Sequence, residues 1–355
     1  MKLYIYLLIA LVCSSCTQKE KYQDCSTFNN ERLAQLPLLS LSGERLVFDQ
    51  DVQNPVKLAL IDSILFLTNM NTGILLDKYN IKNLQKTGDC IPFGSGPNEM
   101  LIVNSIQPTD STAWLFDQSQ NKLYQFILAE LITQQTPSPI NTIKLEMPVD
   151  NILVLSSESI VATALNPENK RLFFFDNTGK CIKSVSSYPD FGKKMSEYER
   201  IESFACQAAL SDDKQHIILT YKRTDLIEIY DLNGNLTSRT QGPDLFFPAL
   251  QQKMDGEHIR VVSDAEKNMD AYFNPFIYKD EIFVLYSGLE FDGKKANYLL
   301  DRMIVFNLSG NPIRQYKLSE PIFNFTIDPK SKMIYGISDN PEFHIVRFCY
   351  ADHTE

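Results

Sequence analysis

The sequence predicts an all-β protein: a six-bladed β-propeller with four-stranded antiparallel blades, whose ring is closed by an N-terminal strand. Three observations favour this fold: a strand–turn–strand unit that recurs six times, a set of glycine-containing turns, and prolines at regular intervals. Self-similarity at a period of about 40 to 50 residues, with several short strands per period, is typical of propellers.

The recurring unit is an apolar strand, an acidic turn and a second apolar strand. One copy reads KLALID-S-ILFL and ends at Leu67, and another reads FIYKD-EIFVLY and ends at Tyr286. The acidic residues of the six turns are Asp62, Asp110, Glu158, Asp212, Asp280 and Asp328. Three of the five intervals between consecutive turns are 48 residues long, and the other two are longer. Each copy therefore predicts the first two strands of one blade.

Two further markers keep step with these units. An aromatic residue followed by a polar turn with Gly, as in Phe175-Asp176-Asn177-Thr178-Gly179, occurs in three units and predicts the turn between the third and fourth strands. Proline cannot donate to a strand ladder, so it belongs where one blade passes to the next. The prolines at these places are Pro55, Pro97, Pro148, Pro189, Pro243 and Pro321.

Together the markers predict six blades. Their expected bounds are residues 55–95, 100–147, 149–188, 203–241, 270–319 and 321–350. The last blade has room for only three strands. We therefore expect residues 44–50 (ERLVFDQ) to supply its outer strand and close the ring, which leaves no unpaired seam.

The N-terminus has the features of a targeting segment. One Lys precedes an apolar run over residues 3–12, which is shorter than the roughly 20 residues that span a bilayer and fits a secretory signal. The following Ser14-Ser15-Cys16 resembles a bacterial lipobox, although Cys13 stands where Leu is usual. A plain signal peptide cut near Ser15 is the alternative. We predict a lipoprotein signal peptide over residues 1–16 with Cys16 lipidated, a polar tether over 17–36, and the propeller over 37–355.

The expected location is the bacterial cell envelope, with a lipid anchor in the outer membrane. The anchoring would be stable, because the lipidated cysteine carries several acyl chains. Lys19, Glu20 and Lys21 mix charges after the anchor, so the periplasmic and the surface face both stay open. The chain has 34 basic and 44 acidic residues, a net charge of −10, which argues against a nucleic-acid partner.

Alternation of the strands places the longest connections on one face of the predicted propeller. The extra segments are residues 189–204, 243–271 and 288–298, beside blades 3 to 5. Because function gathers on loops held by a rigid scaffold, we interpret them as a binding rim. The candidate rim residues are Phe191, Tyr198, Phe246, Phe247 and His258. The alternatives are that these segments only cap the channel mouth, and that Phe246 and Phe247 tuck into the top of the propeller.

The lipobox, the six blades and Gly94-Ser95-Gly96-Pro97-Asn98-Glu99 together resemble the TolB-like six-bladed propeller lipoproteins of Gram-negative bacteria. Tyr286-Ser287-Gly288 also looks like an element of that family. The resemblance covers roughly residues 37–350 and implies a fold and a location more than an activity. The Gly-rich string opens no expected helix, so we interpret it as a tight turn between blades rather than a phosphate-binding loop.

No catalytic motif stands out in the chain. The four histidines have no metal-binding spacing, no GxSxG motif occurs, and the five cysteines after Cys16 contain no CxxC pair. We expect no cofactor and no metal. The favoured hypothesis is a membrane-anchored, non-catalytic binding or scaffold protein that presents the propeller to a protein or glycan partner of the envelope. The alternative is a channel-centred hydrolase or lyase, metal-assisted or not, whose residues come singly from many blades.

Overall fold

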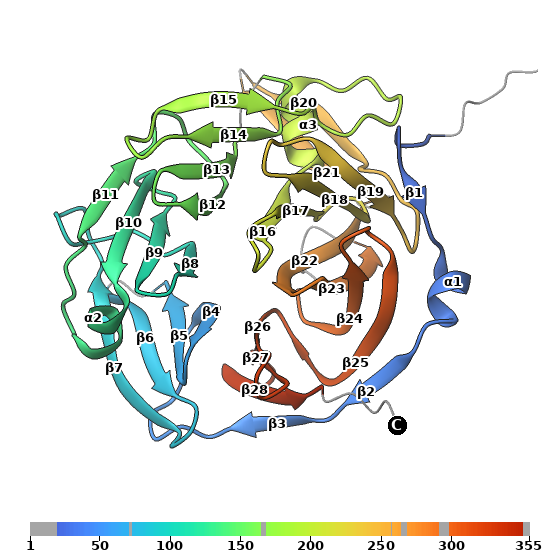
Figure 1. The fold of residues 1–355 in the computed structure, drawn as a ribbon. Helices are drawn as coiled ribbons and strands as arrows, with labels where there is room; N and C mark the ends of the chain where they lie inside the picture. The colour runs from blue at the N-terminus through green and yellow to red at the C-terminus, as the bar shows by residue number, and fades with distance from the viewer. Residues whose placement is uncertain are drawn as a thin grey trace, which may run out of the picture.

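The computed structural model describes residues 20–70, 73–164, 168–256, 258–263, 268–290 and 298–350. These residues form a closed ring of six antiparallel blades around a central channel (Figure 1). The predicted fold class is confirmed, and the observed blades lie within a few residues of their expected bounds.

Each blade runs outward from the channel in chain order. Blade 1 is β4 (Pro55–Ile61), β5 (Ile64–Asn69), β6 (Ile74–Asn80) and β7 (Gln85–Pro92). Blade 2 is β8 (Ser105–Pro108), β9 (Thr112–Asp117), β10 (Lys122–Ile127) and β11 (Asn141–Lys144), with α2 (Leu128–Thr133) after β10. Blade 3 is β12 (Asn151–Ser156), β13 (Ser159–Thr163), β14 (Leu172–Phe175) and β15 (Cys181–Val185).

The second half of the ring repeats this pattern. Blade 4 is β16 (Cys206–Leu210), β17 (His216–Tyr221), β18 (Leu226–Asp231) and β19 (Leu236–Gln241). Blade 5 is β22 (Met269–Tyr278), β23 (Glu281–Glu290), β24 (Leu300–Asn307) and β25 (Pro312–Ile322). Blade 6 is β26 (Asn324–Asp328), β27 (Met333–Ser338), β28 (His344–Cys349) and, from the N-terminus, β3 (Gly43–Leu46).

The turns form where the sequence predicts them. Asp62 adopts a positive φ of 55° between β4 and β5, a conformation that Asp tolerates better than most residues. Between β14 and β15, Asp176 accepts a hydrogen bond from the Thr178 backbone N–H at 2.9 Å, and Gly179 takes the left-handed φ of 84°. One marker differs: Pro321 lies inside β25 rather than between blades. The ladder between β24 and β25 shifts register over this stretch, which removes the need for the missing N–H.

The Gly-rich string of residues 94–99 is a tight turn between blades 1 and 2, as expected. The Glu99 side chain folds back and accepts a hydrogen bond from the Gly96 backbone N–H at 2.8 Å. A Cβ on Gly94 would lie 2.0 Å from the Glu99 carboxylate, so only glycine fits there. The Glu99 carboxylate therefore occupies the inside of this turn.

Ring closure by an N-terminal strand is confirmed, with the strand slightly earlier than predicted. β3 pairs antiparallel with β28, placing Leu46 opposite Ile345 and Glu44 opposite Arg347. The strand begins with Gly43, and a larger residue would not fit easily there, because a Cβ would lie 2.7 Å from the Val346 side chain. Strands from both ends of the chain thus share blade 6, and its outer strand is paired.

The segment expected as a tether belongs to the folded domain from Tyr22 onward. Tyr22, Phe28 and Leu33 are buried. β1 (Ser26–Thr27) extends blade 4 and β2 (Leu38–Leu41) extends blade 5, each in parallel pairing, and α1 (Asn30–Ala34) lies between them. Figure 1 shows this segment, in blue, running along the outside of the ring to β3. Residues 17–36 are mostly polar, and the few apolar residues among them are widely spaced. The sequence interpretation was therefore wrong here.

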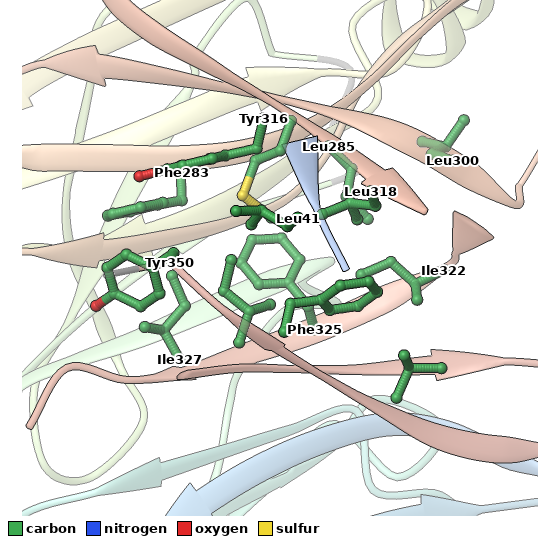
Figure 2. Packing of buried hydrophobic residues seen from close by; sticks show 14 of the residues in the cluster. Leu41, Phe283, Leu285, Leu300, Tyr316, Leu318, Ile322, Phe325, Ile327 and Tyr350 are labelled. Atoms are coloured by element: carbon green, nitrogen blue, oxygen red, sulfur yellow. The ribbon is translucent and has the colours of Figure 1, made fainter. Parts of the chain in front are cut away.

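Apolar cores fill the spaces between neighbouring blades. Between blades 5 and 6, Leu41 of β2 packs among Phe283, Tyr316 and Phe325 (Figure 2). The N-terminal segment therefore contributes to a core that joins the last two blades. Within the described residues, no helix has the length and apolar character that crossing a membrane requires.

Candidate functional site

The centre of the ring is enclosed by the innermost strand of each blade. These strands are β4, β8, β12, β16, β22 and β26 (Figure 1). Each pairs with its own blade on one side only, so its other edge carries backbone N–H and C=O groups without a strand partner. Buried backbone groups must find hydrogen-bond partners.

Side chains of neighbouring blades supply those partners. Gln107 of blade 2 donates to the Ile152 carbonyl at 2.9 Å and accepts from the Val154 N–H at 3.0 Å, both on blade 3. Asn151 of blade 3 donates to the Cys206 carbonyl of blade 4 at 3.1 Å. We call this set of side chains the channel belt: Lys57, Gln107, Asn151, Gln207, Asn274 and Asn324.

The belt continues through the other half of the ring. Gln207 accepts a hydrogen bond from the Asn274 backbone N–H at 2.5 Å, which joins blades 4 and 5. The Asn274 side chain donates to the Phe323 carbonyl at 2.6 Å, joining blades 5 and 6. Asn324 accepts from the Leu58 N–H at 3.4 Å, joining blade 6 to blade 1. Every junction between neighbouring blades therefore has a side chain bonded to the next innermost strand or to the residue just before it.

Lys57 makes the junction between blades 1 and 2, and it differs chemically from the other five side chains. Its ammonium donates to the Asn104 carbonyl at 2.5 Å. Burial lowers the pKa of Lys57, the nearby Lys222 lowers it further, and Asp150 partly opposes both effects. The belt is thus five amides and one ammonium.

A cavity of 290 Å³ lies at the level of the belt. Residues from all six blades line it, including Lys57, Asn104, Asp150, Gln207, Asn274 and Asn324. A second cavity of 590 Å³ lies nearer the turns that join the first and second strands of each blade. Its walls include the apolar residues Ile106, Val154, Phe276 and Ile327. Both cavities have mixed walls, and the second also contains polar and charged residues such as Gln107, Asp212 and Lys214.

The channel belt lies toward the face that carries the long connections, which we call the insertion face. Two of these connections contain regular secondary structure: α3 (Glu197–Ser203) before blade 4, and a hairpin of β20 (Leu250–Asp255) and β21 (His258–Ser263) before blade 5. Glu199 of α3 accepts a hydrogen bond from the Gln252 N–H of β20 at 2.8 Å, so the two insertions support each other.

The insertion face also carries most of the exposed apolar side chains. The described residues include twelve large hydrophobic side chains that are exposed, and eight of them lie on this face. These eight are Val47, Met70, Phe93, Tyr198, Leu245, Met254, Leu289 and Tyr298. Exposed aromatic and aliphatic groups on one face of a rigid scaffold are the usual anchors of an interface.

The predicted rim residues divide into buried and exposed ones. Phe191 is only 4% exposed, and its ring stacks on that of Phe247 at 4.9 Å. Phe247 also packs on Tyr22 at 5.0 Å, and Phe246 is half-buried. Phe191 and Phe247 pack in the core between blades 3 and 4, whereas Phe246 packs against the core between blades 4 and 5, and both cores include residues of the N-terminal segment. Tyr198 is 53% exposed and remains available on the surface.

The other candidate residues are described incompletely. His258 begins β21 and pairs with Asp255 in the backbone register, but its side chain lies outside the described part of the structure. Cys16 also lies outside it. Among the described residues, no three His, Cys, Asp or Glu side chains are arranged to hold a metal.

The channel belt was missed by the sequence analysis, because its residues follow no fixed spacing. Each innermost strand contains a Lys, Asn or Gln of the belt, which taken individually looks like an ordinary polar position of a strand. The distance from the belt residue to the following acidic turn varies from three to seven residues. Only the folded structure shows that these side chains join neighbouring blades.

A buried carboxyl group fixes the connection from blade 4 to the hairpin. Asp225 is fully buried, and it accepts hydrogen bonds from the backbone N–H groups of Asp244 at 2.8 Å and Leu245 at 2.6 Å. Burial raises the pKa of Asp225 to about 7, while these backbone hydrogen bonds act in the opposite direction and the Asp244 carboxylate adds to the rise. Asp225 thereby orders the segment that carries Phe246 and Phe247.

Comparison with known proteins agrees with this architecture. A family model described as TolB-like 6-blade propeller-like matches residues 35–330, so the chain belongs to the TolB-like six-bladed propeller family. No curated protein shows significant similarity to the chain.

Two crystal structures share the fold. A DUF4221 family member from Bacteroides vulgatus is 10% identical with a TM-score of 0.57, covering 89% of this chain and 97% of that one. A predicted exported protein from Bacteroides fragilis is 12% identical with a TM-score of 0.52, covering 92% and 98%. At such identities these similarities concern the fold alone.

Replacing Asp225 by Asn is expected to remove one component of the pH dependence of stability. The unfolded carboxyl ionises near pH 4, whereas the folded one keeps its proton up to about pH 7. Between these values the folded state binds more protons, so Asp225 makes stability fall as pH rises, by at most about 1.4 kcal/mol per pH unit. Above pH 7 its contribution is constant.

Urea unfolding of both proteins between pH 4.5 and 8.5 measures this effect. We expect the stability of the wild type relative to D225N to decline up to about pH 7 and then level off. Parallel stability curves across the whole range would contradict the assignment.

Proposed function

We propose that this protein is a lipid-anchored binding protein of the bacterial cell envelope, which holds a protein or glycan partner on its insertion face. The observation that carries the proposal is the concentration of exposed apolar side chains on that face, around two insertions that brace each other. A rigid ring with adaptable loops on one side is well suited to presenting an interface.

The location rests on two supports of different kinds. The first is the N-terminal sequence, with its short apolar run and Ser14-Ser15-Cys16. The second is a structural relative that is itself a predicted exported protein. Partner recognition outside the cytoplasm agrees with a chain that has no motif for nucleotides or nucleic acid.

A lipid on Cys16 would also orient the propeller. Tyr22 is already part of the fold and donates a hydrogen bond to Thr224 at 2.9 Å, beside the insertion face. Six residues of chain reach at most about 20 Å, so the insertion face would stay close to the membrane surface. A partner would then be one that is itself attached to, or lies against, that membrane.

Removing two anchors of the insertion face should abolish partner capture. We expect the double variant Met254→Ser with Leu289→Ser to lose most of the partner enriched by cross-linking in cells, by about tenfold. The matched control is Ile140→Ser with Ile182→Ser, whose side chains are as exposed but lie away from that face. Equal enrichment by both variants would contradict a role for the insertion face.

Lipid attachment is tested separately by Cys16→Ser. Metabolic labelling with an alkyne fatty acid should mark the wild type and not this variant, which should also leave the membrane fraction. Cys25→Ser is the control, because Cys25 lies within the folded part and should not affect labelling. A C16S protein that is still labelled, or still bound to membranes, would contradict the anchor.

A further inference from the structure

The chemical difference within the channel belt asks for an explanation. At five of the six junctions an amide makes the hydrogen bond to the next innermost strand, and an amide would also satisfy the Asn104 carbonyl that Lys57 contacts. An ammonium group instead brings a positive charge into a partly buried channel, where desolvation disfavours it. Packing and backbone pairing alone do not require that charge.

Lys57 has no carboxylate partner to compensate this cost. Among the described residues, none of the ion pairs includes Lys57, and its one acceptor is a neutral carbonyl. Asp150 attracts it at longer range, but the Asp150 oxygens accept hydrogen bonds from Gln118 at 3.2 Å and Asn151 at 3.0 Å. Lys222 repels it. The remaining ammonium hydrogens are therefore available to an anion.

The space beside Lys57 selects the kind of anion. The 290 Å³ cavity has apolar side chains among its walls, including Leu60, Ile152 and Phe325, and the 590 Å³ cavity beyond it adds apolar residues such as Val154, Phe276 and Ile327 among polar ones. A single ammonium balances one negative charge, which matches a carboxylate better than a phosphate group that carries about two. The amides of the belt can orient a polar head by hydrogen bonds.

We propose that the channel is a binding site for a small monocarboxylate with an apolar body. Its carboxylate pairs with Lys57 at the belt, and its apolar part lies along the channel toward Phe276 and Ile327. This site is distinct from the insertion-face interface proposed above, and it stands or falls independently of that interface.

Calorimetric titration of the full-length protein in detergent tests the site, with titration into detergent alone subtracted. The probes are hexanoate and benzoate, and the controls are the neutral isosteres hexanamide and benzamide. We expect both carboxylates to bind and the amides to bind at least about tenfold more weakly, because only the carboxylates form the ion pair. Equal affinities, or no heat from any carboxylate, would overturn the proposal.

Two variants locate the binding to Lys57. Lys57→Gln should keep the fold, because glutamine makes the same kind of bond at two other junctions, and it should weaken carboxylate binding by at least about tenfold. Lys279→Gln, at an exposed turn, should bind as the wild type does. Unchanged binding by K57Q would overturn the assignment. If K57Q fails to fold, the comparison of carboxylate and amide binding by the wild type still tests the proposal.

Discussion

The rest of this propeller depends on hydrogen-bond partners for the inner edge of each innermost strand. Each of these strands is a sheet edge turned inward, and an unmade buried backbone hydrogen bond costs about 1 to 3 kcal/mol. The channel belt meets this cost with side chains that reach from each blade to the next. The same bonds that satisfy the backbone also fix the blades relative to one another, and they set the width and polarity of the channel.

The outside of the ring is held by a different device. The N-terminal segment adds strands to blades 4 and 5 and then completes blade 6, so three blades share one continuous stretch of chain. Leu41 places this segment in the core between blades 5 and 6. Neither the belt nor the N-terminal segment covers the insertion face, and that is where most of the exposed apolar groups lie.

The fold was largely predictable because its cause is repetitive. The acidic turns, glycine turns and interblade prolines each recur in step, and local turn chemistry does not depend on distant residues. The N-terminal segment was harder, because Tyr22, Phe28 and Leu33 make a pattern only when blades 4 and 5 are in place. The rim was harder still: nothing in Phe191 or Phe247 shows that they stack on each other rather than face solvent. The special position of Lys57 emerges only by comparison with the five amides at the other blade junctions.

Native-state hydrogen exchange tests most directly whether the channel belt joins the blades. The informative groups are the backbone N–H groups of Leu58, Val154 and Asn274, which donate only to side chains of the neighbouring blade. If the belt is part of the cooperative structure, these amides should exchange as slowly as those of the central strands, through global unfolding. Exchange as fast as that of exposed loops would show that the junctions open independently, and would contradict the account.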